Sequence, residues 1–579
     1  MTGPAGHGGH DPVQQWWHSA VVYQIYPRSF ADSDGDGIGD LPGVIDRLDY
    51  LMELGVDVVW LSPVYRSPQD DNGYDISDYQ DIDPMFGTLA DMDRFLEAAH
   101  GRGIRVVMDL VVNHTSDEHP WFVASRSSRD DPKRDWYWWR PARDGAVPGS
   151  PGAEPTNWES LFSGPAWQLD EATGEYYLHV FSRRQPDLNW ENPEVRQAIY
   201  AMMNWWLDRG VDGFRMDVIN ALSKATTLPD GALTGRDGLG DGLPFVFNGP
   251  RIHEFLQEMH REVFAGRDAP LLTVGETPLA TVEDAVLYTD PARHELDMVF
   301  QFEHMSVDQG ASRFDRVPLD LRRLKASLGR WQEGLARVGW NSLYWNNHDQ
   351  VRAVSRFGDD GRYRVESARL LGTVLHLHRG TPYVYQGEEL GMTNLPFADH
   401  TAFRDIESIN YYAAAVASGA DPEQTLAGLR LSSRDNARSP MQWDASAGAG
   451  FTTGTPWLAV NPNAREINAA AEQASPDSVF HHYRRLIALR HELPVVAAGD
   501  FTMLLPDDPT VYAFTRSLDG VTLLVVANFS GAPTPVALPD AADWARDELL
   551  LGNYVAPPAD DGDGDMTLRP WEARIYRRG

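Results

Sequence analysis

Eight short apolar runs, each followed by an amphipathic stretch, constrain the fold of this chain more than any other feature. The runs cover residues 21–30, 55–65, 103–114, 210–217, 271–276, 296–304, 342–349 and 380–389. Stretches such as LPGVIDRLDYLMELG and GPRIHEFLQEMHREVF separate them and carry the helical spacing of apolar residues. Strands that alternate with helices form parallel sheets, and eight such units close into a barrel. The sequence therefore predicts an α/β fold, a (β/α)8 TIM barrel.

A long interruption follows the third apolar run and predicts an inserted domain. Residues 113–181 are rich in Trp, Pro, Gly and Ser and carry no helical spacing of apolar residues. A structureless loop of that length is uncommon inside a compact domain, so we expect a small irregular domain inserted after strand three. The barrel itself is then expected over residues 1–112 and 182–496.

The chain changes character again after the eighth run. A second elaboration is expected at about 391–477, with a helix in IESINYYAAAVASG, and the last barrel helix is expected at 478–493. Short strand-like runs separated by turn residues then fill 497–579, which predicts a C-terminal antiparallel β-sandwich. We interpret the acidic stretch 560–566 in this domain as a solvated turn.

The composition argues against several classes of function. The net charge of −34 disfavours a nucleic-acid partner and polyanionic substrates, because phosphate binding needs a basic surface. Lysine occurs only at Lys133, Lys224 and Lys325, and cysteine is absent, which excludes disulfides, thiol catalysis and zinc–thiolate sites. The N-terminus lacks the basic and apolar segments of a signal peptide, and no run reaches the roughly 18 apolar residues of a membrane span. We therefore expect a soluble, cytoplasmic protein without a membrane partner.

Polar side chains gather where the predicted strands end. In a barrel of this kind functional groups lie at the carboxyl ends of the strands. The polar residues at those ends are Asp109, Asn113, His114, Arg215, Asp217, Glu276, His348 and Asp349. The chain has no Gly-rich phosphate loop, no dinucleotide fingerprint, no HExxH zinc helix and no GxSxG serine elbow. Paired carboxylates that act without a cofactor are suited to the cleavage of glycosidic bonds.

The motifs at these strand ends resemble the α-amylase family of glycoside hydrolases, specifically its oligo-1,6-glucosidase and α-glucosidase branch. The resemblance spans nearly the whole chain and is carried by DLVVNH (109–114), QPDLN (185–189), GFRMDVIN (213–220), VGE (274–276), NNHD (346–349) and RDNARSPMQW (434–443). It implies an exo-acting α-glucosidase that hydrolyses terminal α-linked glucose from short oligosaccharides with retention. The implied linkage is α-1,6, as in isomaltose, and additional α-1,4 activity is left open.

By position in these motifs, the resemblance implies three catalytic carboxylates. Asp217 would be the nucleophile and Glu276 the general acid/base, while Asp349 would orient sugar hydroxyls and help to distort the ring. The cation of Arg215, two residues before Asp217, is expected to keep that carboxylate ionised. Glu276 follows the apolar run LLTVG, so burial is expected to raise its pKa and let it donate a proton near neutral pH. A retaining pair of carboxyl groups should stand about 5–5.5 Å apart.

The resemblance also implies which residues surround the first sugar. They are His114 and His348 as donors to glucose hydroxyls, Tyr74 and Phe181 as aromatic walls, and Asp71 with Arg438 at the closed 4-hydroxyl end. Val218, directly after the nucleophile, accompanies α-1,6 activity in the related enzymes, where alanine accompanies α-1,4 preference. A contact with one methyl group contributes only about 1–3 kcal/mol, so Val218 favours one linkage without excluding the other.

The stretch DSDGDGIGD (32–40) places acidic side chains at the spacing of a calcium loop. Asp32, Asp34, Asp36 and Asp40 stand at positions 1, 3, 5 and 9 of an EF-hand-like ligand ladder, with the Ile38 carbonyl at position 7. The glutamate expected at position 12 is missing. All-oxygen ligands favour Ca²⁺, with Mg²⁺ as the alternative ion, over a transition metal. The loop resembles the structural calcium loop of the same branch, and a solvated acidic turn is the alternative interpretation.

Other functions remain open at this point. A transglucosidase or a trehalose-forming isomerase would use the same double-displacement site, because water and sugar acceptors compete for one glucosyl–enzyme intermediate. Sucrose, trehalose and trehalose 6-phosphate are alternative substrates, although no cluster of lysines or arginines awaits a phosphate. A non-catalytic barrel that serves as a binding or transport-accessory protein is disfavoured, because Asp217, Glu276 and Asp349 are all present. The sequence does not distinguish a monomer from a homodimer.

Overall fold

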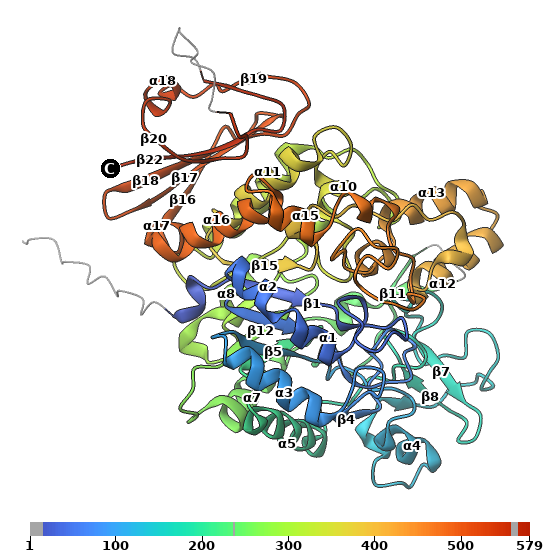
Figure 1. Ribbon diagram of the computed structural model, residues 1–579. Helices are drawn as coiled ribbons and strands as arrows, with labels where there is room; N and C mark the ends of the chain where they lie inside the picture. The colour runs from blue at the N-terminus through green and yellow to red at the C-terminus, as the bar shows by residue number, and fades with distance from the viewer. Residues whose placement is uncertain (1–14, 235–237, 557–565) are drawn as a thin grey trace, which may run out of the picture.

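The computed structural model describes residues 15–234, 238–556 and 566–579. Eight parallel strands form its centre (Figure 1), in the order β13-β12-β9-β5-β2-β1-β15-β14. They are β1 (Val22–Ile25), β2 (Val58–Leu61), β5 (Arg105–Leu110), β9 (Gly213–Met216), β12 (Leu272–Glu276), β13 (Met298–Phe300), β14 (Ser342–Leu343) and β15 (Thr381–Tyr385). A parallel bridge between Val299 and Asn341 joins the two ends of the sheet. The predicted barrel is confirmed, with one strand in each of the eight apolar runs.

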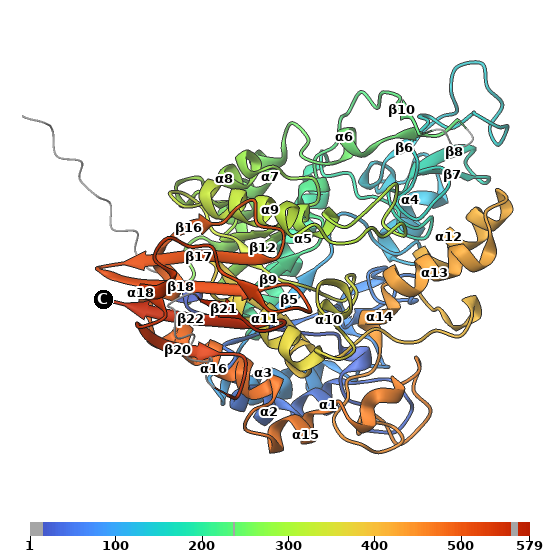
Figure 2. The ribbon, with the colours of Figure 1, turned by 90° about the horizontal axis from the view of Figure 1, so that it is seen from above.

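Amphipathic helices cover the outside of the barrel (Figure 2). They are α1 (Leu41–Asp46), α2 (Leu48–Leu54), α3 (Leu89–His100), α5 (Pro193–Arg209), α7 (Ile252–Met259), α8 (Val282–Thr289), α9 (Leu321–Gly334), α11 (Arg364–His376) and α16 (Val479–Glu492). The local sequence sets their ends. The side chain of Asn192 caps the start of α5, and Gly210 ends it at φ 113°, a left-handed conformation that glycine adopts without strain.

The alternation of side chains along the strands separates two apolar layers. In β2, Val59 and Leu61 pack in the layer that includes the covering helices, whereas Trp60 points into the barrel. The ring of Trp60 lies 5.6 Å from that of Phe300 and 6.2 Å from that of Tyr383, measured between ring centroids. Side chains from β2, β13 and β15 therefore meet in the barrel interior.

The segment inserted after β5 has its own small core. It contains α4 (Pro120–Ser127) and a three-stranded sheet of β6 (Trp139–Arg140), β8 (Glu175–Leu178) and β7 (Trp167–Asp170). The buried residues of this core include Trp138, Trp158 and Trp167. Helix α4 was not predicted from the sequence, because its eight residues are too few to show a clear apolar period.

Two further regions follow the eighth strand. The helix expected in IESINYYAAAVASG is present as α12 (Ile406–Ala417), beside α13 (Pro422–Ser432), and the expected last barrel helix is α16. The C-terminal region is a five-stranded antiparallel sheet in the order β16 (Asp500–Leu504), β17 (Val511–Leu518), β18 (Val521–Asn528), β22 (Ala573–Arg578) and β20 (Glu548–Gly552). A two-stranded sheet of β19 (Thr534–Pro535) and β21 (Thr567–Leu568) contributes to the apolar core on one of its faces. The acidic stretch predicted to be a turn lies, apart from Met566, outside the described residues.

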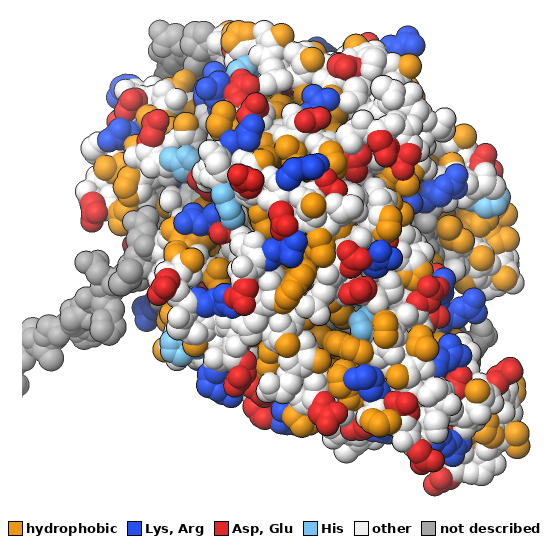
Figure 3. All heavy atoms as spheres, turned by 60° about the horizontal axis from the view of Figure 1, so that its bottom comes forward, with side chains coloured by type: hydrophobic (Ala, Val, Ile, Leu, Met, Phe, Trp, Pro, Cys, Tyr) orange, Lys and Arg blue, Asp and Glu red, His pale blue; other side chains and the backbone are white. Residues whose placement is uncertain are grey.

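The surface mixes side chains of all kinds. Figure 3 shows one face of the molecule, on which acidic, basic and apolar side chains are interspersed. Within the described ranges, no helix combines the length and the apolar character needed to cross a bilayer.

Candidate active site

A cavity of about 350 Å³ lies at the carboxyl ends of the barrel strands. Eight of the predicted site residues line it, namely Asp71, Tyr74, His114, Phe181, Asp217, Val218, Glu276 and Asp349. The other three predicted residues are buried beside the lining. Arg215 contacts Asp217 at 2.8 Å, Arg438 contacts Asp349 at 2.7 Å, and His348 lies 3.5 Å from Asp349.

A larger cavity of about 700 Å³ lies between the inserted domain and α12. It shares Phe162 and Phe181 with the smaller cavity, but none of the three predicted catalytic carboxylates lines it. The smaller cavity is therefore the candidate active site, because it brings the reactive groups together.

Arg215 is the electrostatic centre of this site. Its side chain is 1% exposed, and its Nη1 lies 2.8 Å from Oδ1 of Asp109 and 2.8 Å from Oδ1 of Asp217. Its Nη2 lies 2.8 Å from Oε1 of Glu276. The three carboxylates meet because β5, β9 and β12, which carry or directly precede them, are neighbours in the sheet. The predicted nucleophile and acid/base thus share one cation and line one cavity.

This group has more negative than positive charge. Burial raises the pKa of Asp217 well above its ordinary value, the charge of Glu276 adds to the rise, and Arg215 opposes it. Burial also raises the pKa of Asp109 to about 6. Arg215 thus acts on Asp217 in the expected direction, but burial and the charge of Glu276 outweigh it. One guanidinium faces three buried carboxylates here, which is why Arg215 does not offset the effect of burial on Asp217.

Two arginines surround the third predicted catalytic residue, Asp349. Arg438 Nη2 lies 2.7 Å and Arg434 Nη1 3.3 Å from Oδ1 of Asp349. Burial would raise the pKa of Asp349, but His348 and these two arginines outweigh it and hold the pKa well below its usual range. Arg434 Nη2 also lies 3.0 Å from Asp71, whose pKa burial raises to about 6.

Aromatic rings support both sides of the cavity. Tyr74 stacks on His348, with ring centroids 5.1 Å apart and planes inclined by 3°. The hydroxyl of Tyr74 donates to Oδ2 of Asp109 at 2.9 Å, which ties this wall to the Arg215 group. The ring of Phe181 lies 5.1 Å from that of His114 on the side of the inserted domain.

The two predicted histidine donors differ in their partners. His348 Nδ1 lies 2.8 Å from the amide nitrogen of Gln24, and its Nε2 has no hydrogen-bond partner among the described residues. His114 Nε2 instead faces the carbonyl of Tyr74 at 3.1 Å. Burial lowers the pKa of His114 to about 4 and that of His348 to about 3, so both rings are neutral at pH 7.

Val218 has an unusual backbone. Its φ is 36°, in the left-handed region that β-branched residues rarely adopt. In this conformation its backbone N–H donates to Oε2 of Glu276 at 3.1 Å. Val218 therefore lines the cavity with its side chain and holds the predicted acid/base with its main chain.

Comparison with known families agrees with this arrangement. The family model described as alpha amylase, catalytic domain, matches residues 24–499, and that described as maltogenic amylase, C-terminal domain, matches residues 501–575. The chain belongs to the alpha-amylase family. It is thus a glycoside hydrolase, as the sequence analysis expected.

Relatives in this family cover nearly the whole chain. An oligo-1,6-glucosidase of Parageobacillus thermoglucosidasius is 57% identical over 97% of this chain and 99% of the relative. The crystal structure of a trehalose-6-phosphate hydrolase of Bacillus licheniformis gives a TM-score of 0.90 at 46% identity, over 97% of this chain and all of that one. A trehalulose synthase of Pseudomonas mesoacidophila gives a TM-score of 0.90 at 44% identity, over 98% of this chain and all of that one.

Three charged residues of this alpha-amylase family site were not predicted from the sequence. Arg434, Arg313 and Glu407 line the cavity. Arg313 Nη1 pairs with Glu407 Oε2 at 2.7 Å. Arg434 is the first residue of the motif RDNARSPMQW, so its signal was present, but the motif alone does not show which of its arginines reaches the cavity. Arg313 and Glu407 lie in segments without such a motif.

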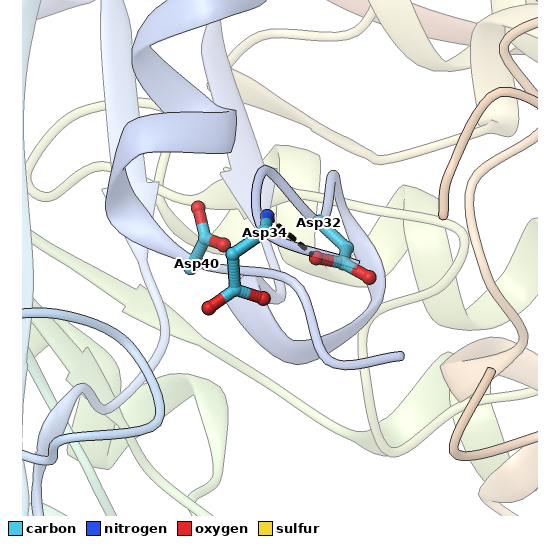
Figure 4. Close-up of side chains that lie close together, drawn as sticks. All are labelled: Asp32, Asp34 and Asp40. Carbon is cyan, nitrogen blue, oxygen red and sulfur yellow. Dashed lines mark hydrogen bonds between the residues drawn. The ribbon is translucent and has the colours of Figure 1, made fainter. Parts of the chain in front are cut away.

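The acidic loop between β1 and α1 brings three carboxylates together. One oxygen each of Asp32, Asp34 and Asp40 lies within 4.8 Å of the others (Figure 4). Asp36 does not belong to this group, and its Oδ1 accepts from the backbone N–H of Ile38 at 2.7 Å. Asp40 additionally caps α1 through the N–H of Gly43. Three convergent carboxylates fit a hard cation such as Ca²⁺ with fewer side-chain ligands than the sequence spacing predicted.

Proposed function

We propose that the protein is an exo-acting α-glucosidase that removes terminal α-linked glucose from short oligosaccharides with retention of configuration. The observation that carries this proposal is the pair Asp217 and Glu276, which line one cavity and bind the same guanidinium at 2.8 Å each. Two carboxyl groups acting on one anomeric carbon are the machinery of glycoside hydrolysis. The relatives named oligo-1,6-glucosidase support the same reaction.

In the proposed reaction the two carboxyl groups have different roles. An oxygen of Asp217 bonds to the anomeric carbon while the bond from that carbon to the leaving oxygen breaks, and Glu276 gives that oxygen its proton. Water then attacks the anomeric carbon, Glu276 takes the proton of this water, and the bond to Asp217 breaks. Two displacements return the original configuration. Asp349, held ionised by its arginines, accepts hydrogen bonds from the sugar hydroxyls.

The contacts at one end of the cavity support exo-cleavage. Asp71 and Arg434 form an ion pair at 3.0 Å, and the guanidinium of Arg434 lies 5.1 Å from the ring centre of Phe162. We propose that this pair, rather than the predicted pair of Asp71 and Arg438, closes the cavity behind the non-reducing glucose. The two arginines of the lining, Arg313 and Arg434, are both paired with carboxylates. This pairing favours a neutral sugar over a phosphorylated one.

We further propose that the enzyme prefers α-1,6 linkages. Val218 lines the cavity next to the bond that breaks, and its left-handed backbone leaves its side chain little freedom to move away. Val218→Ala should lower the ratio of isomaltose to maltose hydrolysis by roughly tenfold, the size of a contact worth about 1–3 kcal/mol. An unchanged ratio would remove Val218 from this role.

A comparison of kcat/KM on isomaltose, maltose, sucrose and trehalose tests the proposal directly. We expect isomaltose to be the best of the four, with glucose as the product and α-glucose as the first anomer released. Asp217→Asn should lower kcat by at least about 10⁴-fold with an intact fold, the scale seen when a catalytic carboxylate is lost. Release of β-glucose first, or near-native turnover by this variant, would refute the retaining assignment.

Transfer to a sugar acceptor is the second candidate. The observation that favours it is the close structural match to a protein named trehalulose synthase. Product analysis after incubation with maltose and sucrose separates the two. Glucose supports hydrolysis, whereas isomeric disaccharides support transfer.

We also propose that Asp32, Asp34 and Asp40 hold a structural calcium ion. None of the three forms an ion pair with a lysine, arginine or histidine in the part of the chain that the structure describes, so their charges lack a protein counter-ion. A bound ion at 100 times its Kd would stabilise the fold by about 2.7 kcal/mol. Removal by chelator should lower the apparent Tm by a few degrees and return of Ca²⁺ should restore it. Asp34→Asn should abolish the difference, and an unchanged Tm in the parent protein would contradict the site.

A further inference from the structure

Lys224 is a fully buried cation near the active-site cavity that takes no direct part in the proposed chemistry. The side chains of Lys224 and Asp187 are both 0% exposed, and Nζ lies 2.9 Å from Oδ2 of Asp187. Nζ also donates to Oδ1 of Asn113 and to the carbonyl of Ala221, each at 2.8 Å. A buried ion pair by itself is weak evidence of a stabilising role, so its neighbours must show what it does.

The ion pair determines the orientation of the Asn113 amide. An ammonium group only donates and a carboxylate only accepts, so Oδ1 of Asn113 must face Lys224. Its Nδ2 then lies 3.3 Å from Oδ2 of Asp187 and 3.1 Å from Nδ1 of His114. Because an amide nitrogen only donates, Nδ1 of His114 must be the acceptor. The proton of this neutral ring is therefore on Nε2.

The partners of Nε2 agree with this assignment. Nε2 of His114 lies 3.1 Å from the carbonyl of Tyr74, which can only accept. Gln185, the other close neighbour, uses its Oε1 to accept from the N–H of Ser182 at 3.0 Å. Its Nε2 is directed to Oδ2 of Asp71 at 3.2 Å and to the same Tyr74 carbonyl at 3.3 Å. Gln185 Nε2 also lies 3.2 Å from His114 Nε2, but its two hydrogens are used by the Asp71 carboxylate and the Tyr74 carbonyl. Two donors converge on the Tyr74 carbonyl, and the contact with Gln185 does not require a bare Nε2.

We propose that the pair Lys224 and Asp187 is a positioning device, which through Asn113 fixes His114 as the Nε2–H tautomer. The Nε2–H of His114 then donates to the Tyr74 carbonyl, and this contact orients the ring in the wall of the cavity that receives the sugar. The effect on activity rests on the proposed function of the site. The tautomer itself does not, and it can be measured separately.

The alternative is that the pair Lys224 and Asp187 only stabilises the fold. Lys325, a second buried lysine far from His114 in sequence, provides the matched control. Lys325 is also buried, and its Nζ donates to the carbonyls of Leu505, Asp508 and Val511 in the C-terminal sheet region. Lys325→Met should lower the free energy of unfolding. It should leave His114 and the kcat/KM of the folded enzyme unchanged.

The test combines two variants with ¹⁵N-histidine spectra of the full-length protein, in which His114→Gln identifies the signals. In Lys224→Met the carboxylate of Asp187 still accepts only from a donor, so the amide nitrogen of Asn113 keeps facing it and the amide keeps its orientation. This variant should lose stability, keep the Nε2–H tautomer and keep kcat/KM for isomaltose at pH 7 within about threefold. In Lys224→Met/Asp187→Asn both charges are gone. The oxygen of the new amide at position 187 continues to accept from Val180, so its nitrogen faces Asn113 and turns that amide over.

The double variant decides between the two roles. We expect it to regain much of the stability lost in Lys224→Met, because no unpaired buried charge remains. We also expect His114 to change to the Nδ1–H tautomer and kcat/KM to fall by roughly ten- to a hundredfold, as when the partner that orients a site histidine is lost.

If Lys224→Met does not fold, the double variant alone carries the test. Recovery of kcat/KM together with stability, or an Nε2–H signal in the double variant, would overturn the proposal. Loss of all activity with the expected tautomers would instead count against the proposed function.

Discussion

Two buried arginine–carboxylate groups flank the cavity, and the pKa values of Asp217 in one and Asp349 in the other are shifted in opposite directions. Around Arg215 one cation serves three carboxylates, and the pKa of Asp217 is raised. Around Asp349 two arginines lie at 2.7 and 3.3 Å, and the pKa of Asp349 is held low. Burial acts in the same direction on both carboxyl groups, so it does not explain the difference. The number of cations within reach of each carboxylate decides whether the group keeps a proton.

The opposite pKa shifts of Asp217 and Asp349 fit the different roles proposed for these two residues. The raised pKa of Asp217 places a proton-binding carboxyl group beside Glu276, where bond cleavage needs proton transfer, whereas the lowered pKa of Asp349 favours a negative charge that can accept from sugar hydroxyls. The loop of Asp32, Asp34 and Asp40 extends the comparison, since it brings three carboxylates together and we propose that a metal ion supplies the positive charge there. Three substitutions test this difference between the two groups.

The largest effect is expected from Arg215→Met, which removes the only cation of the first group. Arg215 lowers the pKa of Asp217, so its removal should raise that pKa further and leave the nucleophile protonated at pH 7. We expect kcat on isomaltose to fall at least about 10³-fold and the free energy of unfolding to fall by about 3–5 kcal/mol. Steady-state rates and urea unfolding measure both, with Arg215→Lys as the variant that keeps the charge. Native kcat in the folded fraction would contradict the role of this cation.

Arg434→Met should have a smaller effect, because Arg438 remains 2.7 Å from Asp349. The variant loses the ion pair with Asp71, so the closed end of the cavity should bind glucose less well. We expect kcat/KM on isomaltose to fall by roughly tenfold to a hundredfold, mainly through KM, as when a contact made in both ground and transition state is removed. A loss of kcat as large as that of Arg215→Met would show that the two groups do not differ as proposed.

Asp71 provides the smallest and most specific test, through the pH dependence of stability. Its pKa of about 6 in the folded protein lies above the unfolded value of about 3.9. Between these values the folded protein binds the proton more tightly, so the contribution of Asp71 to stability falls as the pH rises towards 6 and above. Asp71→Asn should therefore reduce the difference in unfolding free energy between pH 5 and pH 7 by about 1 kcal/mol. An unchanged difference in urea unfolding would mean that Asp71 is ionised throughout this range.

Much of the fold was predictable because its signals are local. Each of the eight apolar runs contains a barrel strand, and IESINYYAAAVASG contains α12. Helix α4 was not predictable, since a short helix with polar neighbours leaves little pattern. Site residues at the ends of strands, such as Asp217 and Glu276, could be found from their position in the sequence. Arg313 and Glu407 could not, because only the folded chain brings their segments to the cavity.

The sequence was enough to predict the barrel and the acids and bases at the carboxyl ends of its strands. Both predictions rest on patterns that run along the chain, namely the spacing of apolar residues and the order of the strands. The tertiary structure alone decided that Arg434 rather than Arg438 reaches Asp71, and that Asp217 gains rather than loses affinity for a proton. Charges and burial act through space and add over every neighbour. A residue two positions away in sequence, such as Arg215, therefore does not set the pKa of Asp217 when two other buried carboxylates draw on the same cation.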